Sequence, residues 1–206
     1  MGVNYGSDIV KEPRPKSSFP ILQPHLPLSD RGFSLYDMLT TLAVVSMIAT
    51  VAVPSFHQLL YSQRMTTAMN TLISALYLAR SESIKRGETA VLCPSSDGRG
   101  CVQRGNIWEE GYLLYIDSND NARVDAEEIV VRHFETTTGL RVQTSADRDD
   151  IRYLPNGLAS GTNATFKFCD AHNRGAPRTV IVSNSGRART SSRMPDGGAI
   201  TCPVPI

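Results

Sequence analysis

The sequence contains few of the residue patterns on which enzymes depend. It has only four histidines, which lie in unrelated contexts, and no nucleophile motif accompanies them. It also lacks a glycine-rich loop of the kind that cradles phosphates and a pair of carboxylates with a catalytic signature. We therefore expect a protein that is not an enzyme and that holds no cofactor. The histidines are His25, His57, His133 and His172.

No single sign of charge dominates the chain. Its 206 residues carry a net charge of +1, so overall electrostatics indicate no partner. The distribution is uneven, however. Residues 87–150 contain 13 acidic and 6 basic residues, a net charge of −7, whereas residues 151–206 contain 7 basic and 2 acidic residues, a net charge of +5. One part of the C-terminal region is therefore acidic and the other is basic.

Cysteine is also scarce, and the four cysteines include no CxxC pair. They form two local groups, Cys93 with Cys101 and Cys169 with Cys202, which favour two disulfides and hence an oxidising compartment. Cys169 and His172 have the spacing of half a metal site, but no second pair matches, so we expect no metal. The alternative is four buried thiols in a cytosolic protein.

One long apolar run stands out, over residues 33–53 (FSLYDMLTTLAVVSMIATVAV). At about 1.5 Å per residue it makes a helix of roughly 30 Å, enough to cross a bilayer core. The preceding 32 residues are polar and proline-rich and carry cations, which favours a cytoplasmic N-terminus and an exported C-terminal region. A secretory signal peptide is disfavoured, because the run is too long and its cut would follow the run.

The start of this run carries a more specific motif. Residues 31–35 (RGFSL) followed by Asp37 resemble the class III signal of type IV pilins and type II secretion pseudopilins. The resemblance implies that a prepilin peptidase cuts between Gly32 and Phe33 and methylates Phe33. A proline about twenty residues later is also typical of the family, and Pro54 stands there.

Asp37 departs from the family, which usually has Glu at this position. A carboxylate in an apolar helix costs several kcal/mol unless it is paired. In pilins it is thought to pair with the positive terminus of a neighbouring subunit, so the resemblance implies an assembly role for Asp37. The alternative is a tolerated polar residue near the membrane edge.

Beyond Pro54, the apolar positions become one-sided, with spacings of three and four residues that predict an amphipathic helix. Gly87 is its expected end, and Pro54 is an expected kink. The predicted buried stripe consists of Met65, Met69, Leu72, Ile73, Leu76, Ala79 and Ser83.

After Gly87, short runs between turn signals predict strands at 89–93, 111–116, 128–134, 140–143, 151–154, 165–169 and 179–183. We therefore expect an α+β, pilin-like fold, in which a long N-terminal helix packs on small antiparallel sheets. The expected segments are a leader (1–32), a transmembrane segment (33–54), an amphipathic helical half (55–86) and a disulfide-bonded head (87–206).

The head resembles the GspH/FimT group of minor pilins and pseudopilins. The residues that carry this resemblance are 92–95 (LCPS) with Cys101, 108–112 (WEEGY), 117–119 (DSN), 156–157 (NG) and 185–189 (SGRAR). It implies a minor pilin of the type IV pilus, single-pass in the inner membrane with a periplasmic head, and extracellular once it is in a pilus. Its partners would be the prepilin peptidase and other pilin subunits. The alternative is a GspH-like minor pseudopilin of a type II secretion system with no role in DNA binding.

Arg187 and Arg189 form the most distinctive cluster of charge. They alternate, so on an extended strand both guanidinium groups face one side, and Gly186 allows a tight turn before them. Arg178 and Arg193 are expected to extend the patch, which suits phosphate oxygens. The pattern resembles the GRxR motif associated with DNA capture during natural transformation in the FimT branch, which implies binding of double-stranded DNA without sequence specificity. The alternative is that these arginines pair with the acidic part of the head or with a neighbouring subunit.

Residues 117–128 have oxygen-bearing side chains at the spacing of a calcium-binding EF-hand loop. These are Asp117, Asn119, Asn121, Asp125 and Glu128. However, Ala122 occupies the position that needs glycine, and the flanking segments are predicted strands. We therefore interpret the segment as a polar hairpin tip.

Overall fold

The computed structural model describes residues 32–102, 108–135, 138–145, 148–159, 161–172 and 175–202. The expected leader, apart from Gly32, lies outside the described residues, as does His25. The chain divides into two compact units, Met1–Val44 and Val45–Ile206.

A long helix, α1, spans Leu35–Arg86, so residue 54 lies within it. The kink expected there stays a prediction. It contains an 18-residue window with a mean hydropathy of 1.9, none of it buried, which by length and composition could cross a membrane. The helix ends where the sequence predicts. Gly87 adopts a φ of +71°, and its N–H donates to the Ser83 carbonyl at 2.9 Å.

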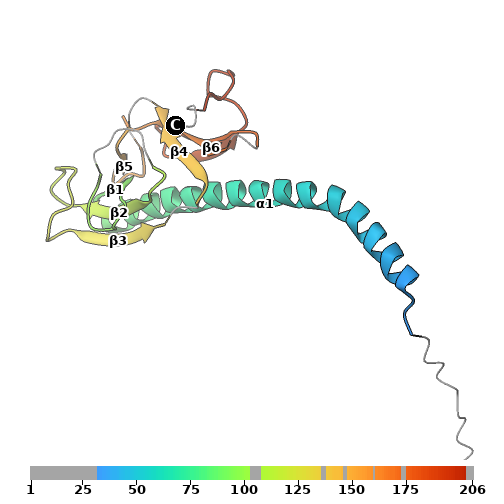
Figure 1. Ribbon diagram of the computed structural model, residues 1–206. Helices are drawn as coiled ribbons and strands as arrows, with labels where there is room; N and C mark the ends of the chain where they lie inside the picture. Colours follow the sequence, from blue (N-terminus) through green and yellow to red (C-terminus); the bar gives the residue numbers. More distant parts are fainter. Residues whose placement is uncertain are drawn as a thin grey trace, which may run out of the picture. The chain divides into compact units, whose positions relative to one another are not determined.

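In the described part of the chain, eight strands form two antiparallel four-stranded sheets beside the C-terminal half of α1 (Figure 1). The first sheet has the order β3-β2-β1-β5 and consists of β1 (Thr89–Pro94), β2 (Tyr112–Asp117), β3 (Ile129–Phe134) and β5 (Ile151–Tyr153). The second has the order β4-β6-β7-β8 and consists of β4 (Leu140–Thr144), β6 (Ala164–Asp170), β7 (Arg178–Val182) and β8 (Ala188–Ser191).

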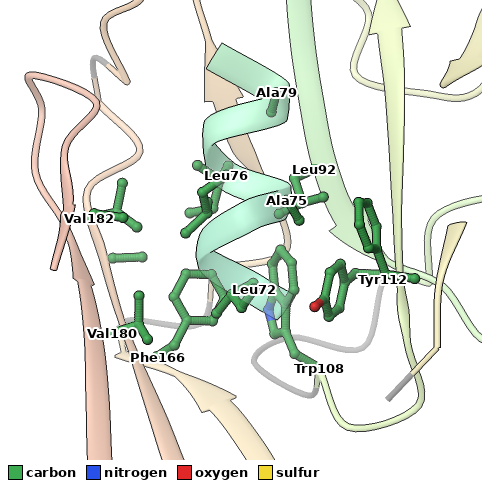
Figure 2. Packing of buried hydrophobic residues seen from close by; sticks show 14 of the residues in the cluster. Leu72, Ala75, Leu76, Ala79, Leu92, Trp108, Tyr112, Phe166, Val180 and Val182 are labelled. Carbon is green, nitrogen blue, oxygen red and sulfur yellow. The ribbon is translucent and has the colours of Figure 1, made fainter. Parts of the chain in front are cut away.

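The core lies where both sheets face α1. Leu72 and Leu76 of the helix lie at the centre of this core (Figure 2). On one side they face Trp108 and Tyr112, and on the other they face Phe166 and Val180 of the second sheet. Trp108 joins the two sides. Its ring meets Phe166 edge-on, with centroids 4.9 Å apart, and its indole N–H donates to the Arg148 carbonyl at 3.1 Å.

The described structure confirms most of the secondary structure that the pattern predicts. The helical stripe is buried, apart from Ile73, which is half-buried against the core. The seven predicted strands are present with ends within one residue of the expected positions. The eighth strand, β8, is additional to them, and it carries part of the arginine cluster.

Candidate functional site

The hairpin of β7 and β8 presents two arginine side chains on one side. Val182 pairs with Ala188, and Ile181 pairs with Arg189. Ala188 is buried in the core, whereas Arg187 and Arg189 are exposed. Because successive side chains of an extended segment point to opposite faces, both arginines project from the face opposite Ala188.

The turn before these arginines is held by contacts that require glycine. Gly186 has a φ of +75°, and a Cβ there would lie 3.0 Å from the Tyr153 ring and nearer still to the Gly157 carbonyl oxygen. The Tyr153 hydroxyl donates to the Gly186 carbonyl at 3.4 Å. Burial raises the pKa of Tyr153 to about 12, so its hydroxyl remains a donor at neutral pH. The sequence shows the glycine but not this support, since Tyr153 lies 33 residues away.

Neither Arg187 nor Arg189 forms an ion pair with any described residue. Ion pairs between described residues include those of Lys85 and Arg86 with Glu82 and of Arg152 with Asp150, and none of these involves Arg187 or Arg189. Pairing with the acidic part of the head, one alternative from the sequence, is therefore not seen among the described residues. Both guanidinium groups face solvent.

Arg178 does not join this cluster, contrary to the expectation from the sequence. It pairs with Phe168 on β6 and lies two residues before the buried Val180 on β7. Residues two apart on a strand share a face, so Arg178 lies on the side of the sheet that faces α1. There it lines a cavity of about 430 Å³ together with Tyr61 and Met65 of α1. The patch therefore excludes Arg178, because strand alternation turns it to the opposite face from Arg189.

Arg193, by contrast, stays on the side of the arginine pair. The Thr179 hydroxyl shares its one proton between the Ser191 carbonyl, at 3.2 Å, and the Arg193 carbonyl, at 3.1 Å. The Arg193 guanidinium donates to the Gly197 carbonyl at 3.3 Å and is exposed. The backbone at Arg193 is thus tied to β7 beyond the end of β8.

The expected processing site lies just before α1. Gly32 and Phe33 are both exposed. The Ser34 N–H donates to the Asp37 carboxylate at 3.1 Å, and the Ser34 hydroxyl accepts from the Tyr36 N–H at 3.3 Å. This reciprocal arrangement is a variant of the capping box, since the Ser34 hydroxyl accepts from the second helical N–H rather than the third. It gives Asp37 a role in starting the helix that we did not infer, although the spacing Ser-x-x-Asp signals it.

The structure contains two disulfides. Cys93 is bonded to Cys101 with a Cα–Cα distance of 5.6 Å, and Cys169 is bonded to Cys202 with a Cα–Cα distance of 5.9 Å. Cys93 belongs to a small cluster on the face of the first sheet that points away from α1. Cys169 lies on the corresponding face of the second sheet, since it alternates with the core residue Phe168. Each bridge therefore fastens a connecting segment over an outer face.

Several polar side chains of the connection between β2 and β3 hydrogen-bond within it. The Asp117 carboxylate accepts from the N–H groups of Asn121 and Ala122, at 3.1 and 2.8 Å. The Asp125 carboxylate accepts from the side-chain amides of Asn119 and Asn121, which lowers the pKa of Asp125. Ala122 has a φ of +59°, so it adopts the left-handed conformation that favours glycine, at the position where a calcium-binding loop needs glycine. Over the described residues, no three His, Cys, Asp or Glu side chains are grouped to hold a metal ion.

Comparison with known proteins gives the family. Residues 68–186, more than half of the chain, match the family described as type II transport protein GspH. The pilin-like protein PilA1 of Thermus thermophilus is 29% identical over 171 residues, which cover 79% of this chain and 99% of that protein. Among solved structures, the type IV minor pilin FimU of Pseudomonas aeruginosa is similar at 19% identity and a TM-score of 0.49, covering 64% of this chain and 90% of that one. The minor pseudopilin EpsH of the Vibrio cholerae type 2 secretion system is similar at 13% identity and a TM-score of 0.45, covering 62% of this chain and 96% of that one. The chain belongs to the GspH family of minor pilins and pseudopilins.

Proposed function

We propose that the chain is a minor pilin of the type IV pilus. In this proposal the prepilin peptidase removes residues 1–32 and methylates Phe33, and residues 33–54 anchor the protein in the inner membrane. Residues 55–86 and the head, 87–206, stand in the periplasm and pack with other pilin subunits, reaching the cell exterior with the pilus. The apolar window of α1 and the exposure of Gly32 and Phe33 support this assignment.

The head, in the same proposal, binds double-stranded DNA through Arg187 and Arg189 during natural transformation. The observation that carries this step is that both guanidinium groups are exposed on one face with no ion pair to a described residue. Guanidinium forks bind phosphate oxygens in a bidentate manner, and phosphate contacts do not read base sequence. The affinity of one subunit is low because the contacts are few, and several subunits along a filament raise it by avidity.

Fluorescence anisotropy of a labelled DNA duplex tests this step. The processed full-length protein, in a nonionic detergent, is titrated into the duplex at salt concentrations from about 50 to 200 mM. With phosphate contacts from Arg187, Arg189 and the neighbouring exposed Arg193, the slope of log K against log salt is about −3, and the double variant Arg187→Ala, Arg189→Ala reduces it to about −1.

Arg178→Ala is the matched control, since it removes an exposed arginine from the opposite face of the same sheet. We expect it to bind as the wild-type protein does. Wild-type protein that does not bind the duplex, or a double variant that binds as tightly as the wild type, refutes the DNA-binding step.

A second candidate function is that of a minor pseudopilin in a type II secretion system. The match of residues 68–186 to the GspH family favours it, because that family is described as a type II transport protein. Deletion of the gene in its host distinguishes the two candidates. Loss of piliation with normal secretion supports the pilus, and loss of secretion with normal piliation supports the pseudopilus.

A further inference from the structure

The face of the second sheet that points away from α1 is more extensive than the arginine hairpin. Strand register places every second residue of β4, β6, β7 and β8 on it. None of the side chains that the register places there is acidic. They are Arg141, Gln143, Thr165, Lys167, Cys169, Thr179, Ile181, Arg189 and Ser191. Of these, Thr165, Cys169, Thr179 and Ile181 are buried, and the other five reach solvent.

Lys167 is the cation nearest the centre of this face. It pairs with Thr179 on β7, which in turn pairs with Ser191 on β8, whereas Arg189 lies two residues along β8 from Ser191. Two strand spacings across and two residues along separate Lys167 from Arg189 by about 12 Å between Cα atoms. Lys167 is partly exposed and forms no ion pair with a described residue.

The segment after β8 brings a further cation to the same place. The Arg193 carbonyl accepts from Thr179, the register partner of Lys167, so the backbone at Arg193 lies one strand away from the lysine. The bridge between Cys169 and Cys202 ties the end of this segment to the same face. Asp196 is the one acidic residue between Ser192 and Cys202.

The geometry points to a single cationic surface that crosses the strands, from Arg187 and Arg189 over Arg193 to Lys167, and that binds the phosphate backbone of double-stranded DNA. This inference rests on the proposed DNA-binding function and adds Lys167, on the neighbouring strand β6, to the phosphate contacts of Arg187, Arg189 and Arg193. A span of about 12 Å parallel to the helix axis covers three or four base pairs of the duplex, at about 3.4 Å of rise per pair. The surface thus reaches several phosphates in a row rather than one.

The salt dependence of binding separates a direct phosphate contact from a structural role. Lys167→Gln keeps most of the side-chain length and removes one charge, so we expect the slope of log K against log salt to become shallower by about 0.9. Lys167→Arg should retain the wild-type slope, and Arg193→Gln should reduce it as Lys167→Gln does. Arg178→Gln, on the opposite face, should leave the slope unchanged. Unfolding followed by Trp108 fluorescence verifies that each variant is folded.

The outcomes distinguish this inference from the function on which it rests. Absence of binding by the wild-type protein overturns both. Binding that Arg187→Ala, Arg189→Ala abolishes, with a wild-type slope in folded Lys167→Gln, overturns the wider surface and leaves the arginine pair. An equal loss of slope in Arg178→Gln and Lys167→Gln overturns the assignment to one face.

Discussion

Replacement of Gly186 by alanine should destabilise the head more than the same replacement at another glycine of left-handed conformation. Gly186 and Gly139 both have positive φ, at +75° and +86°. An alanine in this conformation costs about 1–2 kcal/mol, partly offset by about 0.4–1 kcal/mol from the reduced freedom of the unfolded chain. Gly139→Ala should therefore lower the free energy of unfolding by about 1 kcal/mol.

Gly186→Ala carries an additional steric cost. Its Cβ would overlap the Gly157 carbonyl oxygen and lie 3.0 Å from the Tyr153 ring, whereas no atom lies within 4 Å of a Cβ at Gly139. Overpacking of this kind costs about 1–3 kcal/mol, so the total loss at Gly186 is about 2–4 kcal/mol. For a chain of this size, a loss of 3 kcal/mol lowers the melting temperature by about 6–12 °C, against about 2–4 °C for Gly139→Ala.

The chain contains one tryptophan, Trp108, which is fully buried between the sheets and reports unfolding of the core by its fluorescence. Melting of both variants and the wild type in the same detergent gives the two shifts. Equal shifts for Gly186→Ala and Gly139→Ala would show that the packing of the β7–β8 turn on Tyr153 and Gly157 contributes nothing to stability, and would refute the reasoning.

Three further predictions concern processing, alkaline stability and the β2–β3 connection. Gly32→Ala should leave an uncut precursor because the resemblance assigns the cut to this glycine, and mass spectrometry that finds Phe33 as the N-terminus of the variant would contradict it. Burial raises the pKa of Tyr153 to about 12, so the folded state holds this proton more tightly than the unfolded state does, and its stabilising contribution is lost as the pH rises from about 10 towards 12. Tyr153→Phe should show a smaller fall in melting temperature over this range, and an identical fall would argue against the assignment. Ala122→Gly should raise the stability by about 0.5–1 kcal/mol, because it relieves a φ of +59°, and a lower melting temperature would contradict this conformation.

The sequence predicted the elements of this fold better than their arrangement. Periodic burial is a local signal, so the stripe from Met65 to Ser83 and the seven strands could be found from spacing alone. The division into two sheets could not, since β1 pairs with β5 across more than fifty residues while β4 joins the other sheet. Strand β8 is short and mostly polar (ARTS), which gives a weak apolar pattern.

The candidate site was predictable in part, for a related reason. In any extended segment, Arg187 and Arg189 lie on the same face because they are two residues apart, so this much follows from the sequence. Which face meets the helix depends on the core, and here Val180 and Val182 mark it. Extending their alternation back to Arg178 would have placed that arginine on the α1 side. Lys167 could be found only with the pairing of β6 and β7, which the local sequence does not contain.

The two disulfides also have a mechanical consequence for a subunit that assembles into a filament. A chain under tension lengthens by unravelling its domains, at about 3.4 Å per residue released. The bridges close segments of 8 and 33 residues, and these segments cannot extend while the sulfurs remain bonded. The bridges therefore prevent about 27 Å and about 110 Å of additional extension when the head is pulled. When the disulfides are reduced, a subunit under force should extend by this additional length. The oxidised form therefore limits how far the head can stretch.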